Sequence, residues 1–209
     1  MKYVIAVLTV ICFSCNHQPD KIHPDTLPKH IPVSVKDSMI LSIDKSPMDM
    51  IYFPEDYPQQ KSDTPDKTSP VARVIYSRPQ KNGRVIFADS SLNTNVIQHY
   101  GQAWRLGANE ATEIEFFKAV TINEKKMNPG RYVMYCIPYA DTWKIIFNSN
   151  LHSWGLHIDR TKDITEIELP LQKNDVDIEY FTMRFQNAAY GCNLVMAWDK
   201  MKVVMPVSF

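Results

Sequence analysis

The chain has 209 residues, of which 44% are hydrophobic and 11% aromatic, a composition typical of a packed globular protein and not of a disordered chain. Its 23 basic and 23 acidic side chains balance to a formal net charge of zero, which argues against the basic surface that nucleic-acid binding requires. We therefore expect no nucleic-acid partner, and one domain whose core is large enough to be stable without cross-links.

The N-terminus has the pattern of a secretory signal. Lys2 carries a positive charge, residues 3–13 form a nearly continuous apolar run, and the small Ser14 stands before Cys15. An apolar run of about 11 residues is too short to cross a bilayer. The Ser14-Cys15 pair resembles a bacterial lipoprotein processing site, where the cysteine is diacylated and becomes the new N-terminus. An ordinary signal peptide cut elsewhere, or a short membrane anchor, is the alternative.

These features predict three regions. Residues 1–14 are the lipoprotein signal peptide, residues 15–32 a polar, proline-punctuated flexible tether, and residues 33–209 a single domain. A lipid on Cys15 would hold the water-soluble body at a membrane surface. The default location is the outer membrane of the bacterial envelope, with the domain facing the periplasm.

The four cysteines fall into two pairs. Cys12 and Cys15 have the spacing of a redox or metal pair, but both lie in the processing segment, so this match is accidental. Cys136 and Cys192 lie in apolar, strand-like runs of the mature body. An oxidising periplasm would allow them to pair if their strands were neighbours, yet free cysteines behave as small core hydrophobes, and we favour two buried thiols.

The first part of the body predicts strands joined by polar connections. Apolar residues in the segment 33–53 indicate one or two strands, residues 59–70 a hydrophilic loop, and the β-branched segment 71–76 another strand. The Asn82-Gly83 dipeptide is a strong turn signal, so residues 84–87 are expected to return as the second arm of a hairpin.

The second part alternates apolar and polar residues with a period of two. Residues 88–99 are polar and irregular, with one helical turn expected around Val96 and Ile97. The later strands are expected at residues 112–116, 131–137, 143–148, 154–158, 164–171, 178–186, 194–198 and 203–207. Short strands at close spacing without a long helical period predict an all-β fold, an antiparallel β-sandwich of about 8–10 strands.

Several motifs occur in an order that resembles a known family. They are SPMDMIYFPEDYP, VARVIYSRPQKNGR, AWRLGANEATEIEFFKAV, NPGRYVMYCIPYADTWKIIFN, WG and NLVMAW. This order is similar to that of the family called domain of unknown function 2911, which is common in Bacteroidota, and the likeness covers residues 46–209. The resemblance implies a secreted or lipid-anchored all-β protein and supplies no activity.

Signatures of catalysis, metal binding and cofactor binding are missing from the sequence. There is no GxSxG, HExxH, P-loop or GxGxxG motif, so we expect no cofactor and lean towards a protein that is not an enzyme. His152 and His157 are five residues apart, but neither a cysteine nor a carboxylate pair completes a metal site. His99 could act as a general base, although no nucleophile can be assigned to it.

The candidate binding residues surround the WRLGANE segment. They are Arg78, Trp104, Arg105, Asn109 and Glu110. In a structural reading, Arg105 and Glu110 form an ion pair across a turn at Gly107, while Asn109 bonds to the loop backbone. In a functional reading, the arginines lie at the rim of the sandwich and grip a carboxylate, phosphate or sugar hydroxyl, and Trp104 supplies a stacking face.

Two functions are compatible with these residues. The favoured one is a non-catalytic, lipid-anchored envelope module that binds a glycan, a peptide or an envelope protein. The alternative is a hydrolase of envelope glycan or peptide that uses Glu110 or His99. A glycoside hydrolase needs two carboxylates about 5–9.5 Å apart, and Glu113 and Glu115 are the possible partners of Glu110.

Overall fold

The structure is a computed structural model that describes residues 45–64, 69–92 and 95–209. The expected signal peptide, the lipidation site at Cys15, the tether and the predicted strand residues up to position 44 lie outside the described residues. In the part of the chain that is described, no helix is long and apolar enough to cross a membrane.

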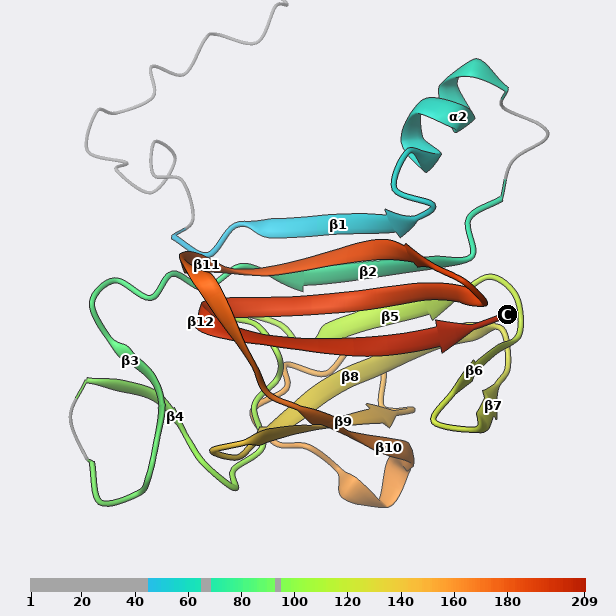
Figure 1. The fold of residues 1–209 in the computed structure, drawn as a ribbon. Helices are drawn as coiled ribbons and strands as arrows, with labels where there is room; N and C mark the ends of the chain where they lie inside the picture. Colours follow the sequence, from blue (N-terminus) through green and yellow to red (C-terminus); the bar gives the residue numbers. More distant parts are fainter. Residues whose placement is uncertain (1–44, 65–68, 93–94) are drawn as a thin grey trace, which may run out of the picture. The chain divides into compact units, whose positions relative to one another are not determined.

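Strands make up most of the described chain (Figure 1). They are β1 (Met48–Phe53), β2 (Ala72–Ser77), β3 (Val85–Ala88), β4 (Val96–His99), β5 (Thr112–Phe116), β6 (Val120–Ile122), β7 (Lys125–Met127), β8 (Gly130–Pro138), β9 (Thr142–Asn148), β10 (Asp163–Pro170), β11 (Gln172–Ala188) and β12 (Gly191–Ser208). The helical elements are the α-helix α2 (Tyr57–Asp63) and a 3-10 turn, η2 (Arg160–Lys162).

The strands form two main sheets and one small pair. A six-stranded sheet has the order β1-β2-β5-β8-β9-β10, and its neighbouring strands are antiparallel. A four-stranded sheet has the order β11-β12-β6-β7, and β3 pairs with β4 in parallel. This arrangement confirms the predicted all-β sandwich, whose two main sheets together hold ten strands.

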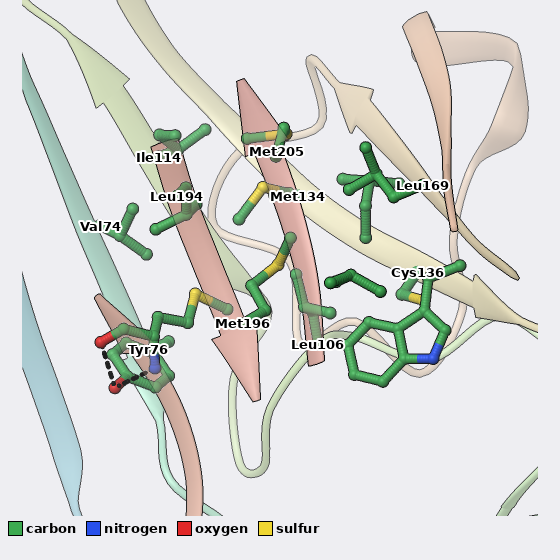
Figure 2. Packing of buried hydrophobic residues seen from close by; sticks show 14 of the residues in the cluster. Val74, Tyr76, Leu106, Ile114, Met134, Cys136, Leu169, Leu194, Met196 and Met205 are labelled. Atoms are coloured by element: carbon green, nitrogen blue, oxygen red, sulfur yellow. Dashed lines mark hydrogen bonds between the residues drawn. The ribbon is translucent and has the colours of Figure 1, made fainter. Parts of the chain in front are cut away.

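The inner faces of the two main sheets share one hydrophobic core (Figure 2). Strand alternation places Phe181, Met183 and Phe185 of β11 in it, each 2% exposed or less, while the intervening side chains are more exposed. Val74 of β2 and Leu194 of β12 reach the same core from opposite sheets. Burying one such side chain stabilises the fold by about 1.5–3 kcal/mol, so the two sheets are held together mainly by apolar burial.

An aromatic cluster fills one part of this core. Trp104, Trp143 and Trp198 are each 5% exposed or less. Trp104 stacks on Trp198 with ring centroids 5.6 Å apart and meets Phe181 edge-on at 5.0 Å. Offset and edge-to-face pairs of this kind add about 0.5–1.5 kcal/mol each beyond area burial. Three of the four tryptophans are therefore structural.

The turn predicted after β2 is present, but the hairpin predicted from it is wrong. Asn82 and Gly83 have φ angles of 49° and 69°, and the Arg84 amide donates to the Lys81 carbonyl at 3.0 Å. Both edges of β2 are already occupied, by β1 on one side and β5 on the other. The chain after the turn therefore pairs elsewhere, as β3 with β4, and the helical turn expected around Val96 is a strand.

Other segments also differ from the expectations. The helix α2 overlaps the start of the loop predicted at residues 59–70, and Pro58 lies in its first turn, where a proline is tolerated. Residues 194–198 and 203–207 belong to one long strand, β12, and residues 154–158 form bends instead of a strand. The hairpin β6-β7 was not predicted, because its strands have only three residues each.

The two cysteines of the body are free and buried, as predicted. Cys136 lies on β8 of the six-stranded sheet and Cys192 on β12 of the four-stranded sheet. Both belong to the hydrophobic core, and burial raises the pKa of each thiol, that of Cys192 to about 12. They behave as core residues and not as nucleophiles.

Candidate functional site

The WRLGANE segment forms a tight loop between β4 and β5. The backbones of Trp104 and Cys136 exchange two hydrogen bonds, of 2.7 and 2.8 Å, which attach the loop to β8. The Trp104 indole N–H donates to the Gly107 carbonyl at 3.1 Å, and the buried Thr112 hydroxyl donates to the Leu106 carbonyl at 2.7 Å. The loop is therefore fixed from inside the core.

Arg105 joins this loop to the segment that follows β9. Its Nη1 donates to the backbone carbonyls of Asn109 and Trp154, the latter at 3.1 Å. Burial lowers the pKa of Arg105. Among the ion pairs of the described residues there is none between Arg105 and Glu110, so the expected pair is wrong. Backbone carbonyls satisfy the guanidinium in its place.

Gly155 allows the two segments to pack closely. Its φ of +77° is left-handed, and a Cβ at this position would lie 2.7 Å from the Arg105 Cβ and 3.1 Å from the Ala111 Cβ. Neither the backbone angle nor the space suits another residue. The Trp154-Gly155 pair is therefore held against Arg105, which fixes the position of the Trp154 backbone.

A cleft of about 480 Å³ lies on the side of the six-stranded sheet that faces away from the core; we call it the outer-face cleft. Its lining residues are Met48, Ile75, Tyr76, Ser77, Glu110, Ala111, Glu113, Arg131, His152, Ser153 and Trp154. The strand registers pair Met48 with Ser77 and Ile75 with Glu113, so adjacent strands supply its floor. The loop before β5 and the loop after β9 supply its walls.

The floor of the outer-face cleft holds a carboxylate that has a hydrogen bond and an ion pair, and a hydroxyl that has no hydrogen-bond partner among the described residues. Glu113 accepts a hydrogen bond from the His152 amide at 3.4 Å and pairs with Arg131 at 3.5 Å. Ser77 is 2% exposed, and its hydroxyl has no hydrogen-bond partner among the described residues. Buried polar groups are nearly always hydrogen-bonded, so an unpartnered hydroxyl beside a cleft indicates a place for a ligand or water.

The walls of the outer-face cleft present a carboxylate and large apolar surfaces. Glu110 is exposed and takes part in no ion pair that the described residues form. Trp154 is 58% and Met48 56% exposed, unlike the three core tryptophans. A largely apolar pocket with a few polar groups converging on it is the usual form of a small-molecule site.

A second cleft, of about 470 Å³, is lined in part by the loop that carries Arg105; we call it the basic cleft. Its lining residues are Ser46, Pro79, Arg84, Ile97, Gln98, Gln102, Ala103, Trp104, Arg105, Gly107, Ala108, Gly155 and Leu156. Trp104 is only 5% exposed and its ring is packed in the core. The expectation that Trp104 offers a stacking face is therefore wrong.

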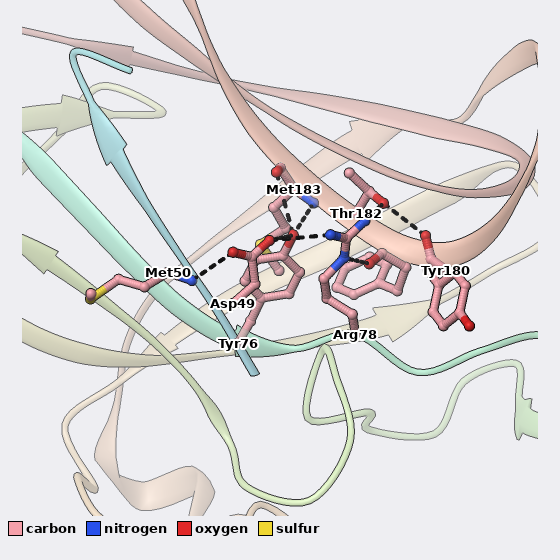
Figure 3. Close-up of polar contacts among 8 residues, drawn as sticks. Asp49, Met50, Tyr76, Arg78, Tyr180, Thr182 and Met183 are labelled. Atoms are coloured by element: carbon pink, nitrogen blue, oxygen red, sulfur yellow. Dashed lines mark hydrogen bonds and ion pairs between the residues drawn. The ribbon is translucent and has the colours of Figure 1, made fainter. Parts of the chain in front are cut away.

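Arg78 lines neither cleft and instead bridges the two sheets (Figure 3). Its Nη2 donates to the Thr182 hydroxyl at 2.8 Å, its Nε to the Phe181 carbonyl at 3.3 Å, and its Nη1 lies 3.5 Å from Asp49 Oδ2. These partners belong to β11 and β1. Arg78 thus has structural contacts that its prediction as a binding residue did not include.

The five predicted binding residues are therefore divided by the structure. Glu110 lines the outer-face cleft, while Trp104 and Arg105 line the basic cleft. Asn109 lines neither, and its side chain donates to the Ser46 carbonyl at 3.4 Å. Asn109 and Arg78 therefore hydrogen-bond to other parts of the protein and do not line either cleft.

The described histidines are not grouped with other possible metal ligands. Within the described ranges, no group of three or more His, Cys, Asp or Glu side chains is arranged to hold a metal ion. His152 lines the outer-face cleft, but His157 does not. His99 also lines neither cleft, although its buried Nδ1 has no hydrogen-bond partner among the described residues.

Sequence reasoning missed Ser77 and Arg131 as possible binding residues, and it did not include Trp154 among the five candidates. Ser77 ends a strand in which Ala72, Val74 and Tyr76 point to the core, so period two does place it on the opposite face. Trp154 was expected in a strand, at residues 154–158, and the structure instead leaves it outside any strand and exposed. Nothing in the sequence indicates that these residues share one cleft.

The comparisons with known proteins identify a family and leave the activity open. Neither a curated protein nor a solved structure matches the chain. One family model matches residues 58–207, which is most of the sequence and includes both loops that shape the clefts. The chain therefore belongs to the family described as Protein of unknown function (DUF2911).

Proposed function

We propose that this chain is a lipid-anchored protein of the bacterial cell envelope whose domain binds a sugar-class ligand, without catalysis, in the outer-face cleft. The observation that carries the proposal is the buried Ser77 hydroxyl, which has no partner among the described residues and lies beside a cleft walled by an exposed tryptophan.

The chemistry of the cleft suits sugars. The exposed face of Trp154 can stack on the apolar face of a pyranose ring. Glu110 and Glu113 can accept hydrogen bonds from ring hydroxyls, and Arg131 can donate hydrogen bonds to them. Ser77 can do both. Two carboxylates and one guanidinium give the lining a formal charge of −1 when histidine is left out of the count, which favours a neutral ligand over an anion.

The volume of the cleft sets the size of the ligand. About 480 Å³ lies within the range of about 300–1,000 Å³ that small-molecule sites occupy. The cleft can therefore hold one or two sugar residues of a longer glycan.

Titration of the full chain in detergent with a panel of envelope oligosaccharides, including peptidoglycan disaccharide fragments, tests the binding. Binding should change the tryptophan fluorescence, because Trp154 would lie against the ligand. The change should be lost in Trp154→Ala and retained in Tyr190→Ala, a matched control whose ring is 84% exposed and outside both clefts. Equal behaviour of the two variants, or no binding by the panel, would contradict the proposal.

The anchor is tested separately, in cells. The support for it is the sequence around Cys15, which follows a charged residue, an apolar run and a small residue. Metabolic labelling with a clickable palmitate analogue should label the chain and Cys12→Ala, but not Cys15→Ala. Labelling of Cys15→Ala would remove the lipoprotein assignment without affecting the sugar site.

A glycan hydrolase is the second candidate function. The observation that favours it is that Glu110 and Glu113 both line the outer-face cleft, beside His152. Incubation with the same oligosaccharides, followed by measurement of new reducing ends, separates the two. A binding module releases none, whereas release that disappears in Glu110→Gln would make the protein a hydrolase.

A further inference from the structure

The two clefts differ in charge. The lining of the basic cleft includes Arg84 and Arg105 and no carboxylate, so its formal charge is +2, against −1 for the outer-face cleft. A cleft whose charged lining residues are all of one sign concentrates ligands of the opposite sign. The basic cleft therefore selects a different class of ligand.

Arg105 has hydrogen-bond donors to spare. Its two bonds to protein both leave from Nη1, and in the part of the chain that the structure describes neither Nε nor Nη2 has an acceptor. Its side chain is only partly exposed and has no carboxylate partner among the described ion pairs. A guanidinium held in this way favours the binding of an anion, because its charge is otherwise uncompensated.

Arg84 is held in a similar manner. Its Nε and Nη2 donate to the backbone carbonyls of Lys81 and Gln80, at 3.1 and 2.6 Å, which leaves Nη1 without a partner among the described residues. Carbonyl acceptors fix the guanidinium without neutralising it. Gln98 and Gln102 add amide groups to the lining. The cleft thus combines two positioned cations with neutral donors.

From this arrangement we propose that the basic cleft is a second binding site, separate from the sugar site, that takes the oxyanion of a small ligand, either a carboxylate or a phosphate group, between Arg84 and Arg105. Guanidinium groups bind both anions through paired N–H donors. Whether this anion site exists does not depend on the proposed sugar site, because the two clefts are lined by different residues.

Calorimetric titration of the full chain in detergent at low ionic strength tests the site. The probes are inorganic phosphate and D-glucuronate, with D-glucose as the match that lacks the carboxylate. Phosphate or glucuronate should bind, and Arg84→Gln should weaken that binding about tenfold or more, because it removes a charge-assisted hydrogen bond. Binding of glucuronate alone would identify a carboxylate site, and binding of phosphate alone a phosphate site.

A charge insertion supplies the decisive control. Gln102→Glu places a carboxylate in the exposed wall of the basic cleft and should abolish anion binding, while Gln172→Glu makes the same change on β11, outside both clefts. Ser77→Ala, in the outer-face cleft, should leave anion binding unchanged. Absence of binding by either anion, or an equal loss in the Gln102 and Gln172 variants, would overturn the proposal.

Discussion

The polar side chains that lie between the two sheets form a hydrogen-bonded network in which each has several partners. The Tyr76 hydroxyl accepts a hydrogen bond from the Met183 amide at 2.9 Å and donates to Asp49 Oδ2 at 3.2 Å. Arg78 approaches the same carboxylate and also bonds to β11 (Figure 3). Because an unpaired buried group costs about 1–3 kcal/mol, this network depends on all of its members.

Tyr76→Phe should therefore lower the free energy of unfolding by about 1–3 kcal/mol, because the Met183 amide loses its side-chain acceptor. Chemical denaturation measures the change. Tyr132→Phe is the matched control, since the Tyr132 hydroxyl donates to the Asn128 carbonyl at an exposed position and its loss should cost less than about 1 kcal/mol. Equal costs would show that the network between the sheets contributes little.

The same tyrosine makes stability depend on alkaline pH. Burial raises the pKa of Tyr76 to about 12 in the folded protein, whereas in the unfolded chain it lies near 10. The folded state therefore holds the proton of Tyr76 more tightly than the unfolded chain does. The resulting contribution to the free energy of unfolding is complete below about pH 10 and is lost as the pH rises towards about 12. Tyr135, also raised to about 12, contributes to the same decline. In Tyr76→Phe the decline should be smaller.

At the level of elements, two glycines test how the loops are packed. Gly155 and Gly101 have nearly the same φ, +77° and +75°, but an added Cβ would meet Arg105 and Ala111 at Gly155 and nothing within 4 Å at Gly101. Backbone strain is therefore common to both, and only Gly155→Ala adds a clash. That clash should make it about 1–3 kcal/mol more destabilising than Gly101→Ala.

Gly155→Ala should also weaken ligand binding, since it displaces the segment that carries Trp154. Thermal unfolding and the fluorescence titration of both variants provide the two readings. If the two glycine variants behaved alike, the contact between Gly155 and Arg105 would not be what positions the wall of the outer-face cleft.

Strands of period two were predictable from the sequence, and strand partners were not. The alternation of Phe181, Met183 and Phe185 identifies an inner face from local pattern alone. By contrast, the Asn82-Gly83 turn predicted a hairpin that β1 and β5 prevent by occupying both edges of β2. Pairing of this kind is a property of distant segments, which a local pattern does not contain.

The candidate site shows the same division. The sequence singled out Glu110 and Arg105, which do line clefts, but one of its two readings joined them in an ion pair that is not formed. It also expected an exposed ring at Trp104, which is buried, whereas Trp154 is exposed. Which of two tryptophans is core depends on the packing of both sheets, so residue type and spacing could not decide it.

At the scale of the whole molecule, the core joins the two sheets, and no disulfide links them among the described residues. Cys136 and Cys192 are free and buried, and burial raises the pKa of both thiols. We expect neither to react with iodoacetamide in the native protein and both to react after denaturation, as mapped by mass spectrometry. A reductant should leave the melting temperature unchanged. Native labelling, or a lower melting temperature with reductant, would contradict this description of the core.

Ser77→Ala tests whether the outer-face cleft is built for a ligand. Thr112→Val is the control, because the Thr112 hydroxyl is equally buried but donates to the Leu106 carbonyl at 2.7 Å. The measurement is the free energy of unfolding of both variants, together with the sugar affinity of Ser77→Ala.

Since the Ser77 hydroxyl has no partner among the described residues, Ser77→Ala should leave stability unchanged or raise it, whereas Thr112→Val should lower it by about 1–3 kcal/mol. Sugar affinity should fall by about five- to tenfold in Ser77→Ala, the value of roughly one hydrogen bond. A loss of stability as large as that of Thr112→Val, with sugar affinity unaffected, would show that Ser77 serves the fold and not a ligand.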